Sequence, residues 1–111
     1  MQNYQHGSVV LLALPFSDTA TFKLRPALVL LDTADDDIVV SRITSKMLQT
    51  AFDVEIVEWQ QAGLMRPSIV RLHKVNTVEK VLVNRQLGIL QPHDIIFESI
   101  YSESKVLGSM P

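Results

Sequence analysis

The chain alternates short apolar runs with polar or turn-forming residues, a pattern typical of a protein built mainly from β-strands. The first run, residues 8–14, follows Gly7 and stops at Pro15, which cannot donate a hydrogen bond to a neighbouring strand. Residues 15–23 are mostly polar and are predicted to form a loop. The continuous apolar segment 27–31 is predicted to be the next strand.

Residues 33–37 form a turn signal between segment 27–31 and a second apolar segment, 38–43. These two segments are predicted to pair as an antiparallel hairpin. Residues 44–51 are expected to hold one short helical turn. Residues 52–56 alternate apolar and charged side chains, as in a strand with one face in solvent.

Further along, Gly63 marks a turn, and segments 68–72 and 75–83 are each predicted to be strands. Gly88 then interrupts the pattern, and Pro92 stands where a helix can begin. The residues that would form a stripe along that helix are Ile95, Ile96, Ser99, Ile100 and Val106. The whole pattern predicts a small barrel-like sheet closed by a C-terminal α-helix.

Composition narrows the class of protein. A length of 111 residues leaves little room for a second core, so one domain over residues 1–111 is expected. The apolar fraction of 47% and the charged fraction of 20% fit a folded globular protein. The apolar runs are far shorter than the roughly 20 residues of a membrane span, and no signal peptide is recognisable. No membrane association is predicted, and a cytoplasmic location is expected.

The net charge of −2 counts against binding of nucleic acid through the total charge of the protein alone. The charges are unevenly distributed, however. Residues 38–85 contain seven Lys or Arg and four Asp or Glu, an excess of +3, while acidic residues gather in 32–37 and near the C-terminus. Two interpretations stay open here: a basic face on an acidic protein, or an ordinary mixed surface.

Several kinds of reaction chemistry are excluded by the residues that the chain lacks. Without cysteine there is no disulfide and no thiolate metal site, and the three histidines have no metal-binding spacing. The glycines are isolated, so no phosphate-binding loop is predicted, and no serine has the context of a strained nucleophile turn. The acidic run 35–37 is interpreted as a solvated turn. No metal and no cofactor are therefore expected.

A polar pair at the predicted hairpin offers a different chemistry. Arg25 precedes the strand 27–31, and Thr44 with Ser45 ends the strand 38–43. Antiparallel pairing would bring Arg25 and Thr44 to the same edge of the sheet. A guanidinium and a hydroxyl suit phosphoryl transfer on RNA, which supplies its own nucleophile in the 2′-hydroxyl. The alternative is a surface ion pair beside two residues that merely end a strand.

At these residues the sequence resembles the MazF/PemK (Kid-like) toxin family. The early motifs that carry the resemblance are Gly7-Ser8-Val9-Val10, Pro15-Phe16-Ser17-Asp18 and Lys23-Leu24-Arg25-Pro26-Ala27-Leu28-Val29. The later ones are Ile43-Thr44-Ser45, Gly63-Leu64-Met65-Arg66-Pro67-Ser68-Ile69-Val70-Arg71-Leu72, Lys74-Val75-Asn76-Thr77-Val78 and Leu87-Gly88-Ile89-Leu90. The resemblance covers residues 7–90 and rests on the order and spacing of motifs that are individually weak.

The resemblance implies a small SH3-like barrel of the CcdB/MazF toxin type, followed by a C-terminal α-helix. It implies the toxin of a type II toxin–antitoxin system, acting as a homodimer and inhibited by a cognate antitoxin protein. The activity that it implies is a metal-independent, sequence-specific endoribonuclease, which cleaves single-stranded RNA through 2′-hydroxyl attack and so inhibits translation and growth.

Carried over residue by residue, the resemblance makes Arg25 and Thr44 the catalytic residues. Arg25 would take part in proton transfer and contact the phosphate, and Thr44 would stabilise the transition state. Because arginine stays protonated near neutral pH, binding of the phosphate is the physically safer part of the Arg25 assignment. The residues expected to bind the substrate are Ser45, Lys23, Ser17, Asp18, Arg66, Ser68 and Arg71. For Arg66 and Arg71, solvated charges at strand edges are an equal alternative.

Two aromatic-ring residues are not assigned to the site: Trp59 is expected in a core or interface, and His73 on the surface or in packing. The chain also departs from the family pattern, since Ser8 stands where an acidic residue is usual and the approach to Arg25 is less basic. These departures leave altered specificity or a degenerate toxin open. The alternative functions are a non-enzymatic SH3-like binding module and a CcdB-like toxin that poisons a topoisomerase.

Overall fold

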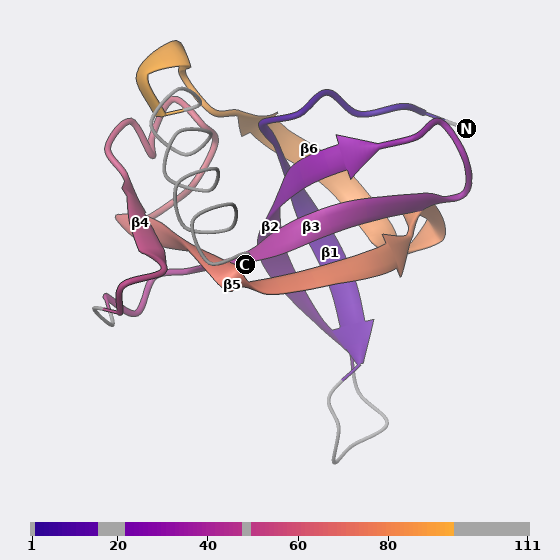
Figure 1. Cartoon of the computed structure of the whole chain (residues 1–111), viewed down its shortest axis with the longest axis horizontal. Coiled ribbons are helices and arrows are strands. Elements are labelled where there is room, and N and C mark those ends of the chain that lie inside the picture. Colours follow the sequence, from indigo (N-terminus) through magenta and orange to yellow (C-terminus); the bar gives the residue numbers. More distant parts are fainter. Residues whose placement is uncertain (1, 16–21, 48–49, 95–111) are drawn as a thin grey trace, which may run out of the picture.

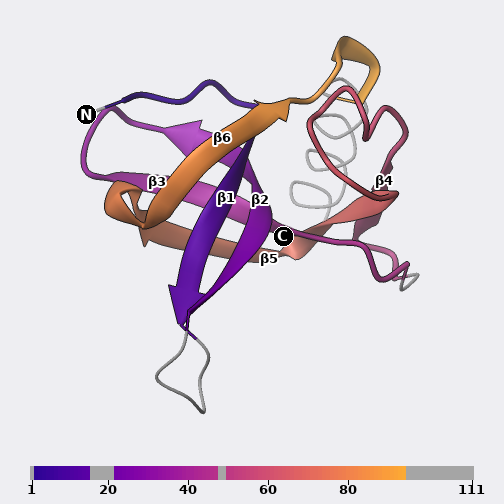
Figure 2. The ribbon, with the colours of Figure 1, turned by 180° about the vertical axis from the view of Figure 1, so that it is seen from behind.

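The computed structural model describes residues 2–15, 22–47 and 50–94. Its strands are β1 (Ser8–Pro15), β2 (Phe22–Asp32), β3 (Asp37–Thr44), β4 (Asp53–Ile56), β5 (Ser68–Glu79) and β6 (Val83–Ile89), with a 3₁₀ helix, η1 (Lys80–Leu82), before β6. The described strands form one antiparallel sheet in the order β4-β5-β3-β2-β1-β6, and the sheet is strongly curled (Figures 1 and 2). The prediction of a mainly β, barrel-like fold is confirmed.

The strand predictions for the first half of the chain are confirmed, because the four apolar or alternating segments lie in β1, β2, β3 and β4. The predicted hairpin is present, with Ala27 opposite Arg42 and Val29 opposite Val40. Both faces of its strands are covered, which explains why the apolar runs are continuous rather than alternating.

The loop predicted over residues 15–23 is shorter than expected where it is described. Pro15 is the last residue of β1 and pairs with Phe22, the first residue of β2, while residues 16–21 lie outside the described part. Proline is tolerated at this position because β6 pairs with β1 only as far as Leu12. Beyond that point no described strand pairs with this edge of β1, so a missing N–H breaks no described ladder there.

The prediction of separate strands over 68–72 and 75–83 is wrong. β5 runs from the first segment into the second, and the chain turns through η1 before β6 begins. Opposite the neighbours Ser41 and Arg42 of β3, β5 carries three additional residues, 72–74. Such a bulge bends a strand without ending it and shifts which side chains face inward. The interrupted alternation therefore gave the appearance of two strands.

Two shorter predictions are also corrected. Gly88 does not interrupt a strand but lies within β6, where a Cβ atom would sit 2.5 Å from the backbone oxygen of Ala62. The helical turn expected in residues 44–51 is absent from the described part of that segment. Instead, Thr44 ends β3, and its Oγ1 accepts a hydrogen bond from the backbone N–H of Lys46 at 3.1 Å. A side-chain turn of this kind competes with helix formation.

The C-terminal segment is described only at its beginning. Residues 92–94 are helical, so the helix starts at Pro92 as predicted, whereas the predicted stripe from Ile95 to Val106 lies outside the described residues. Asp94 is buried, and its carboxylate accepts the backbone N–H groups of Val57 and Glu58 at 3.0 and 2.9 Å. This carboxylate fixes the chain that leaves β4. No helix in the described part is long and apolar enough to cross a membrane.

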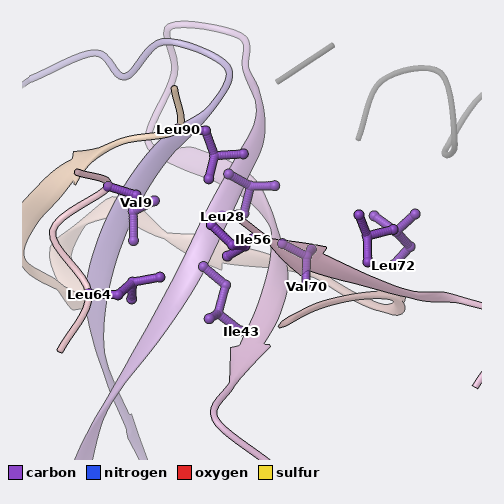
Figure 3. Close-up of a cluster of buried hydrophobic side chains, with 10 residues drawn as sticks. Val9, Leu28, Ile43, Ile56, Leu64, Val70, Leu72 and Leu90 are labelled. Atoms are coloured by element: carbon purple, nitrogen blue, oxygen red, sulfur yellow. The ribbon is translucent and has the colours of Figure 1, made fainter. Parts of the chain in front are cut away.

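Two apolar clusters cover the two faces of the central strands. The first contains Val9 and Leu28 and extends to the chain around β4 and β5, as Figure 3 shows. The second contains the alternate neighbours Val10 and Ala27. Trp59 is partly buried against the first cluster, in line with the core role expected from the sequence. The central strands are therefore held from both sides.

A buried ion pair joins the end of β2 to η1, and both of its residues also bind the N-terminal segment. The Nζ of Lys80 lies 2.9 Å from Oδ1 of Asp32, and both side chains are almost fully buried. Lys80 also donates to Oδ1 of Asn3 at 2.9 Å, and the backbone N–H of Tyr4 donates to Oδ2 of Asp32 at 2.6 Å. The hydrogen bond from Tyr4, followed by the bonds and charge from Lys80 and Ala34, lowers the pKa of Asp32 below its ordinary 3.8.

This network predicts an acid-dependent loss of stability. Because the pKa of Asp32 is lowered by folding, its contribution is present above the unfolded-state pKa of 3.8 and is lost as the pH falls below that value. Urea unfolding of the wild type and Asp32→Asn, from about pH 6 down to about pH 3, measures this effect. The variant is expected to lose less stability over the acid end of that range. Parallel curves for the two proteins would contradict the assignment.

Candidate functional site

A groove of about 800 Å³ lies where β2 begins and β3 ends. Its walls come from the ends of β2 and β3, the chain leading into β5, and β6. The lining residues are Leu11, Arg25, Pro26, Arg42, Ile43, Thr44, Ser45, Lys46, Gly63, Leu64, Met65, Arg66, Ser68, Arg71, Arg85 and Leu87. We call this depression the basic groove, for the reason given below.

Arg25 and Thr44 both line the basic groove. The pairing of β2 with β3 ends with Ala27 opposite Arg42, and Arg25 and Thr44 each lie two residues beyond that pair, at the same end of the hairpin. The structure thus brings the two residues to one edge of the sheet, as their positions in the sequence predict, while their catalytic roles stay predictions. The Thr44 Oγ1 accepts the N–H of Lys46, so this bond leaves the hydroxyl hydrogen available for another acceptor.

Of the residues predicted to bind substrate, Ser45, Arg66, Ser68 and Arg71 line the groove. Lys23 is exposed on β2 and lies further out along the β1–β2 hairpin, outside the groove lining. Ser17 and Asp18, also predicted to bind substrate, lie outside the described residues. The structure therefore gathers the predicted residues of β3 and β5 together with the two catalytic candidates.

Arg71 is held from behind by the adjacent strand β4. Its Nε donates to Oδ1 of Asp53 at 3.2 Å, and the Asp53 side chain is only 2% exposed. Asp53 also accepts the backbone N–H of Thr50 at 3.1 Å, so the carboxylate is fixed. On the outer side, Nη2 of Arg71 lies 3.4 Å from Nε2 of His73, whose ring rests against Phe52. Arg71 is therefore a positioned side chain and not a freely moving surface charge.

The charge of the groove is one-sided. Six of the chain's ten Lys and Arg residues line it, whereas no acidic residue does so in the part of the chain that the structure describes. Low-dielectric walls concentrate the field of such a set and attract polyanions even to an acidic protein. Of the two interpretations that the sequence left open, the groove favours a basic face.

Three of the lining cations were not identified from the sequence, namely Arg42, Lys46 and Arg85. Arg85 reaches the groove because β6 pairs with β1, which places it opposite Leu11. That contact joins segments far apart in the sequence, so no local pattern reveals it. The only available signal was the excess of basic residues between 38 and 85.

The position at which the chain departs from the family pattern is remote from this site. Ser8 is buried at the start of β1, opposite Ile89, and does not line the groove. Ser8 is therefore not one of the side chains that surround Arg25 and Thr44. Within the described residues, no group of three or more His, Cys, Asp or Glu side chains is arranged to hold a metal ion.

Residues 5–96 match the family model of the "PemK-like, MazF-like toxin of type II toxin-antitoxin system". The chain belongs to this toxin family. The match covers most of the chain, including all the described strands and the residues that line the basic groove. The resemblance inferred from the motifs is therefore confirmed. A search of curated protein sequences gives no significant match.

Solved structures similar to this toxin support the same fold. A chain of the MazE–MazF crystal structure (Form-II) from Deinococcus radiodurans has a TM-score of 0.75 and 20% identity, covering 99% of this chain and 100% of that one. An endoribonuclease from a Mycobacterial species has a TM-score of 0.73 and 17% identity, covering 100% and 98%. A Mycobacterial endoribonuclease in complex with its cognate antitoxin gives 0.70 and 17%, covering 96% of each chain.

Proposed function

We propose that this toxin is a sequence-specific endoribonuclease that cleaves single-stranded RNA without a metal ion. The observation that carries the proposal is the convergence of Arg25 and Thr44 in a groove lined by cations. A guanidinium offers a planar fork for two phosphate oxygens, and a hydroxyl can donate to a third. Both groups act on the phosphate that an RNA strand would bring into the groove.

The reaction uses a nucleophile that the substrate supplies. The 2′-oxygen of RNA attacks the neighbouring phosphorus, the bond from phosphorus to the 5′-oxygen breaks, and the products are a 2′,3′-cyclic phosphate and a free 5′-hydroxyl. The 2′-hydroxyl loses one proton and the departing 5′-oxygen gains one, so the step needs no cofactor. Arg25 and Thr44 would stabilise the extra negative charge on the phosphoryl oxygens in the transition state.

The remaining features of the family fit this activity. The other groove cations would hold phosphates on either side of the cleaved bond, and RNA cleavage would inhibit translation and growth. One structural relative is an endoribonuclease in complex with its cognate antitoxin, and we extend that partnership to this chain. We further propose a single domain that acts as a homodimer in the cytoplasm, with the antitoxin covering the basic groove until it is released.

The decisive test is an RNA cleavage assay in the presence of EDTA. Purified toxin is incubated with a set of single-stranded RNAs of varied sequence, and the cut sites are mapped by primer extension. Cleavage at defined short sequences, leaving a cyclic phosphate, is the expected result. An RNA with a 2′-deoxy nucleotide on the 5′ side of the cut site should stay intact, because it lacks the nucleophile.

A Thr44→Val variant purified in the same way controls for contaminating ribonucleases and should cleave far more slowly. RNA that stays intact with well-folded wild type, across all sequences, would contradict the proposal. If the same protein then inhibited a topoisomerase, the CcdB-like alternative would replace it. If neither RNA nor topoisomerase responded, a binding module without enzymatic activity would be the remaining interpretation.

A further inference from the structure

A row of charged residues crosses three neighbouring strands beside the catalytic candidates. Asp53 of β4 is paired with Arg71 of β5, and Arg71 is paired with Arg42 of β3. Residues paired in this way have Cβ atoms about 4.5–5.5 Å apart and share one face of the sheet. Arg42 and Arg71 are therefore two like charges in adjacent positions, an arrangement that destabilises a sheet unless a counter-charge is present.

The counter-charge inside the protein serves only one of the two arginines. Asp53 is nearly fully buried and binds Nε of Arg71, whose side chain is 17% exposed. Arg42 is exposed and lines the basic groove, and within the described part of the chain it has neither an ion pair nor a side-chain hydrogen bond. The pair thus carries one uncompensated positive charge, directed at the groove.

The row lies one step along β3 from the proposed catalytic pair. Thr44 and Arg42 are two residues apart on β3, roughly 6.7 Å, and point to the same face of the sheet. Arg42 is paired with Arg71 across β3 and β5, and Arg25 lies two residues before Ala27, the partner of Arg42 on β2. An RNA strand with one phosphate at Arg25 and Thr44 would therefore bring a neighbouring phosphate to the two arginines.

Space for the RNA continues past Arg42. A smaller cavity of about 260 Å³ adjoins the basic groove and shares Arg25, Pro26 and Arg42 with it. Asn76 and Thr77 stand in its wall and provide polar groups. Arg42 thus lines both hollows, and an RNA strand that occupied both would pass it.

We propose that Arg42 and Arg71 form a second phosphate subsite, which binds the phosphate next to the one that is cleaved. Asp53 is the positioning residue of this subsite, because it holds Arg71 through Nε while Nη2 faces His73, which leaves Nη1 for the ligand. The subsite rests on the proposed ribonuclease function. Its role is to fix the register of the RNA, so that the correct phosphate reaches Arg25 and Thr44.

The test removes one charge from the protein and one from the RNA. The probe is a single-stranded RNA containing the mapped cleavage sequence, with a 2′-deoxy nucleotide at the cut site to prevent reaction. A set of such probes carries one uncharged methylphosphonate linkage each, at successive positions. Binding is measured for wild type, for Arg42→Gln, and for Lys74→Gln. The last is a control with the same loss of charge on exposed β5, outside the groove lining.

Wild type should bind about tenfold more weakly when the linkage next to the cut site is uncharged, as expected for the loss of one charge-assisted hydrogen-bonded contact. Arg42→Gln should bind the all-phosphate probe about tenfold more weakly and should be insensitive to that linkage, while it stays sensitive at the cleaved phosphate. The slope of log affinity against log salt should fall by about 0.7 for this variant. Lys74→Gln should behave as wild type.

Asp53→Asn tests the positioning role. In this variant, an uncharged linkage next to the cut site should reduce the affinity less than it does in wild type. KM should rise while kcat at saturating RNA stays unchanged, whereas a general loss of structure would lower kcat as well. The subsite is disproved if Arg42→Gln keeps its sensitivity to every neighbouring linkage, or loses it only at the cleaved phosphate. If the wild type cleaves RNA and Arg42→Gln gives either of these results, the subsite alone is overturned. A wild type that neither cleaves nor binds RNA overturns the proposed function and the subsite together.

Discussion

Arg25→Ala is expected to lower kcat/KM for RNA cleavage by about 100- to 1,000-fold, the usual cost of removing one preorganised donor from an oxyanion. Arg25 is exposed, so the fold should be unaffected. The loss should fall mainly on kcat, because the negative charge that the guanidinium binds is greatest in the transition state. Initial rates at limiting and at saturating concentrations of a mapped RNA substrate give kcat/KM and kcat. A thermal melt of each protein checks the fold. Arg25→Lys should recover only a fraction, since an ammonium lacks the two-pronged geometry.

Arg66→Ala is the matched control for Arg25→Ala. Arg66 lines the same groove and is also exposed, but it lies on the chain before β5 and not on the β2–β3 hairpin that carries Arg25 and Thr44. Its removal lowers the positive charge of the groove by the same amount and should cost about tenfold or less, mostly in KM. Equal losses for the two variants would mean that Arg25 contributes charge alone, and the assigned chemistry at Arg25 would be wrong.

The part of the site that was predictable from the sequence depended on one local relation. Arg25 and Thr44 flank a hairpin whose strands and turn are both visible in the apolar pattern, and antiparallel pairing is enough to bring them together. The same local reasoning succeeded for β1 to β4. It also gave the family, because the motifs follow these elements in order.

The part that was missed depends on pairing between distant segments. Arg85 enters the groove through the β1–β6 pairing, and Arg42 meets Arg71 only because β5 bulges at residues 72–74. A bulge changes the register by an amount that side-chain polarity does not reveal. The sequence could show that basic residues are concentrated between 38 and 85, but not that they share one concave surface.

The fold also separates stabilising charges from functional ones. Lys80 and Asp32 form a buried pair at the far end of β5, where their charges cancel and hold the N-terminal segment. In the groove, Asp53 compensates only Arg71. Arg42, beside Arg71, has no acidic partner among the described residues; this costs stability through repulsion, and a bound polyanion would remove that cost. The distribution of acids thus matches a protein whose total charge is negative and whose groove is positive.

Gly63→Ala is expected to reduce the free energy of unfolding by about 3 kcal/mol or more, from backbone strain and overpacking combined. Residues 57–63 form a turn that ends in a left-handed residue, Gly63, with φ of +88°. The backbone N–H of Leu64 bonds the Trp59 oxygen at 3.0 Å, and that of Gly63 bonds the Gln60 oxygen at 3.1 Å. The same pair of hydrogen bonds commonly ends a helix at a left-handed glycine, where a side chain is disfavoured.

The space around Gly63 adds a second and larger penalty. A Cβ atom at this position would lie 2.2 Å from the backbone oxygen of Leu87 in β6. At Gly88, next in β6, a Cβ atom would in turn meet the backbone of Ala62, so the two glycines permit one close approach of backbone to backbone. A rigid backbone cannot yield as a flexible side chain does, and the turn must move away from β6.

That displacement links stability to function, because Leu64 and Arg66 follow the turn and Leu87 lies opposite, all in the groove lining.

Urea unfolding of wild type, Gly63→Ala and the neighbouring exposed control Gln61→Ala measures the change in the free energy of unfolding, and the control should stay within about 0.5 kcal/mol of wild type. In Gly88→Ala the clash acts without the left-handed strain, so its loss should be smaller but still above that of the control. A Gly63→Ala protein as stable as Gln61→Ala would show that the turn and β6 are less tightly apposed. In that case the wall of the groove could adjust its position, and the turn would not fix the position of the groove charge that follows it, Arg66.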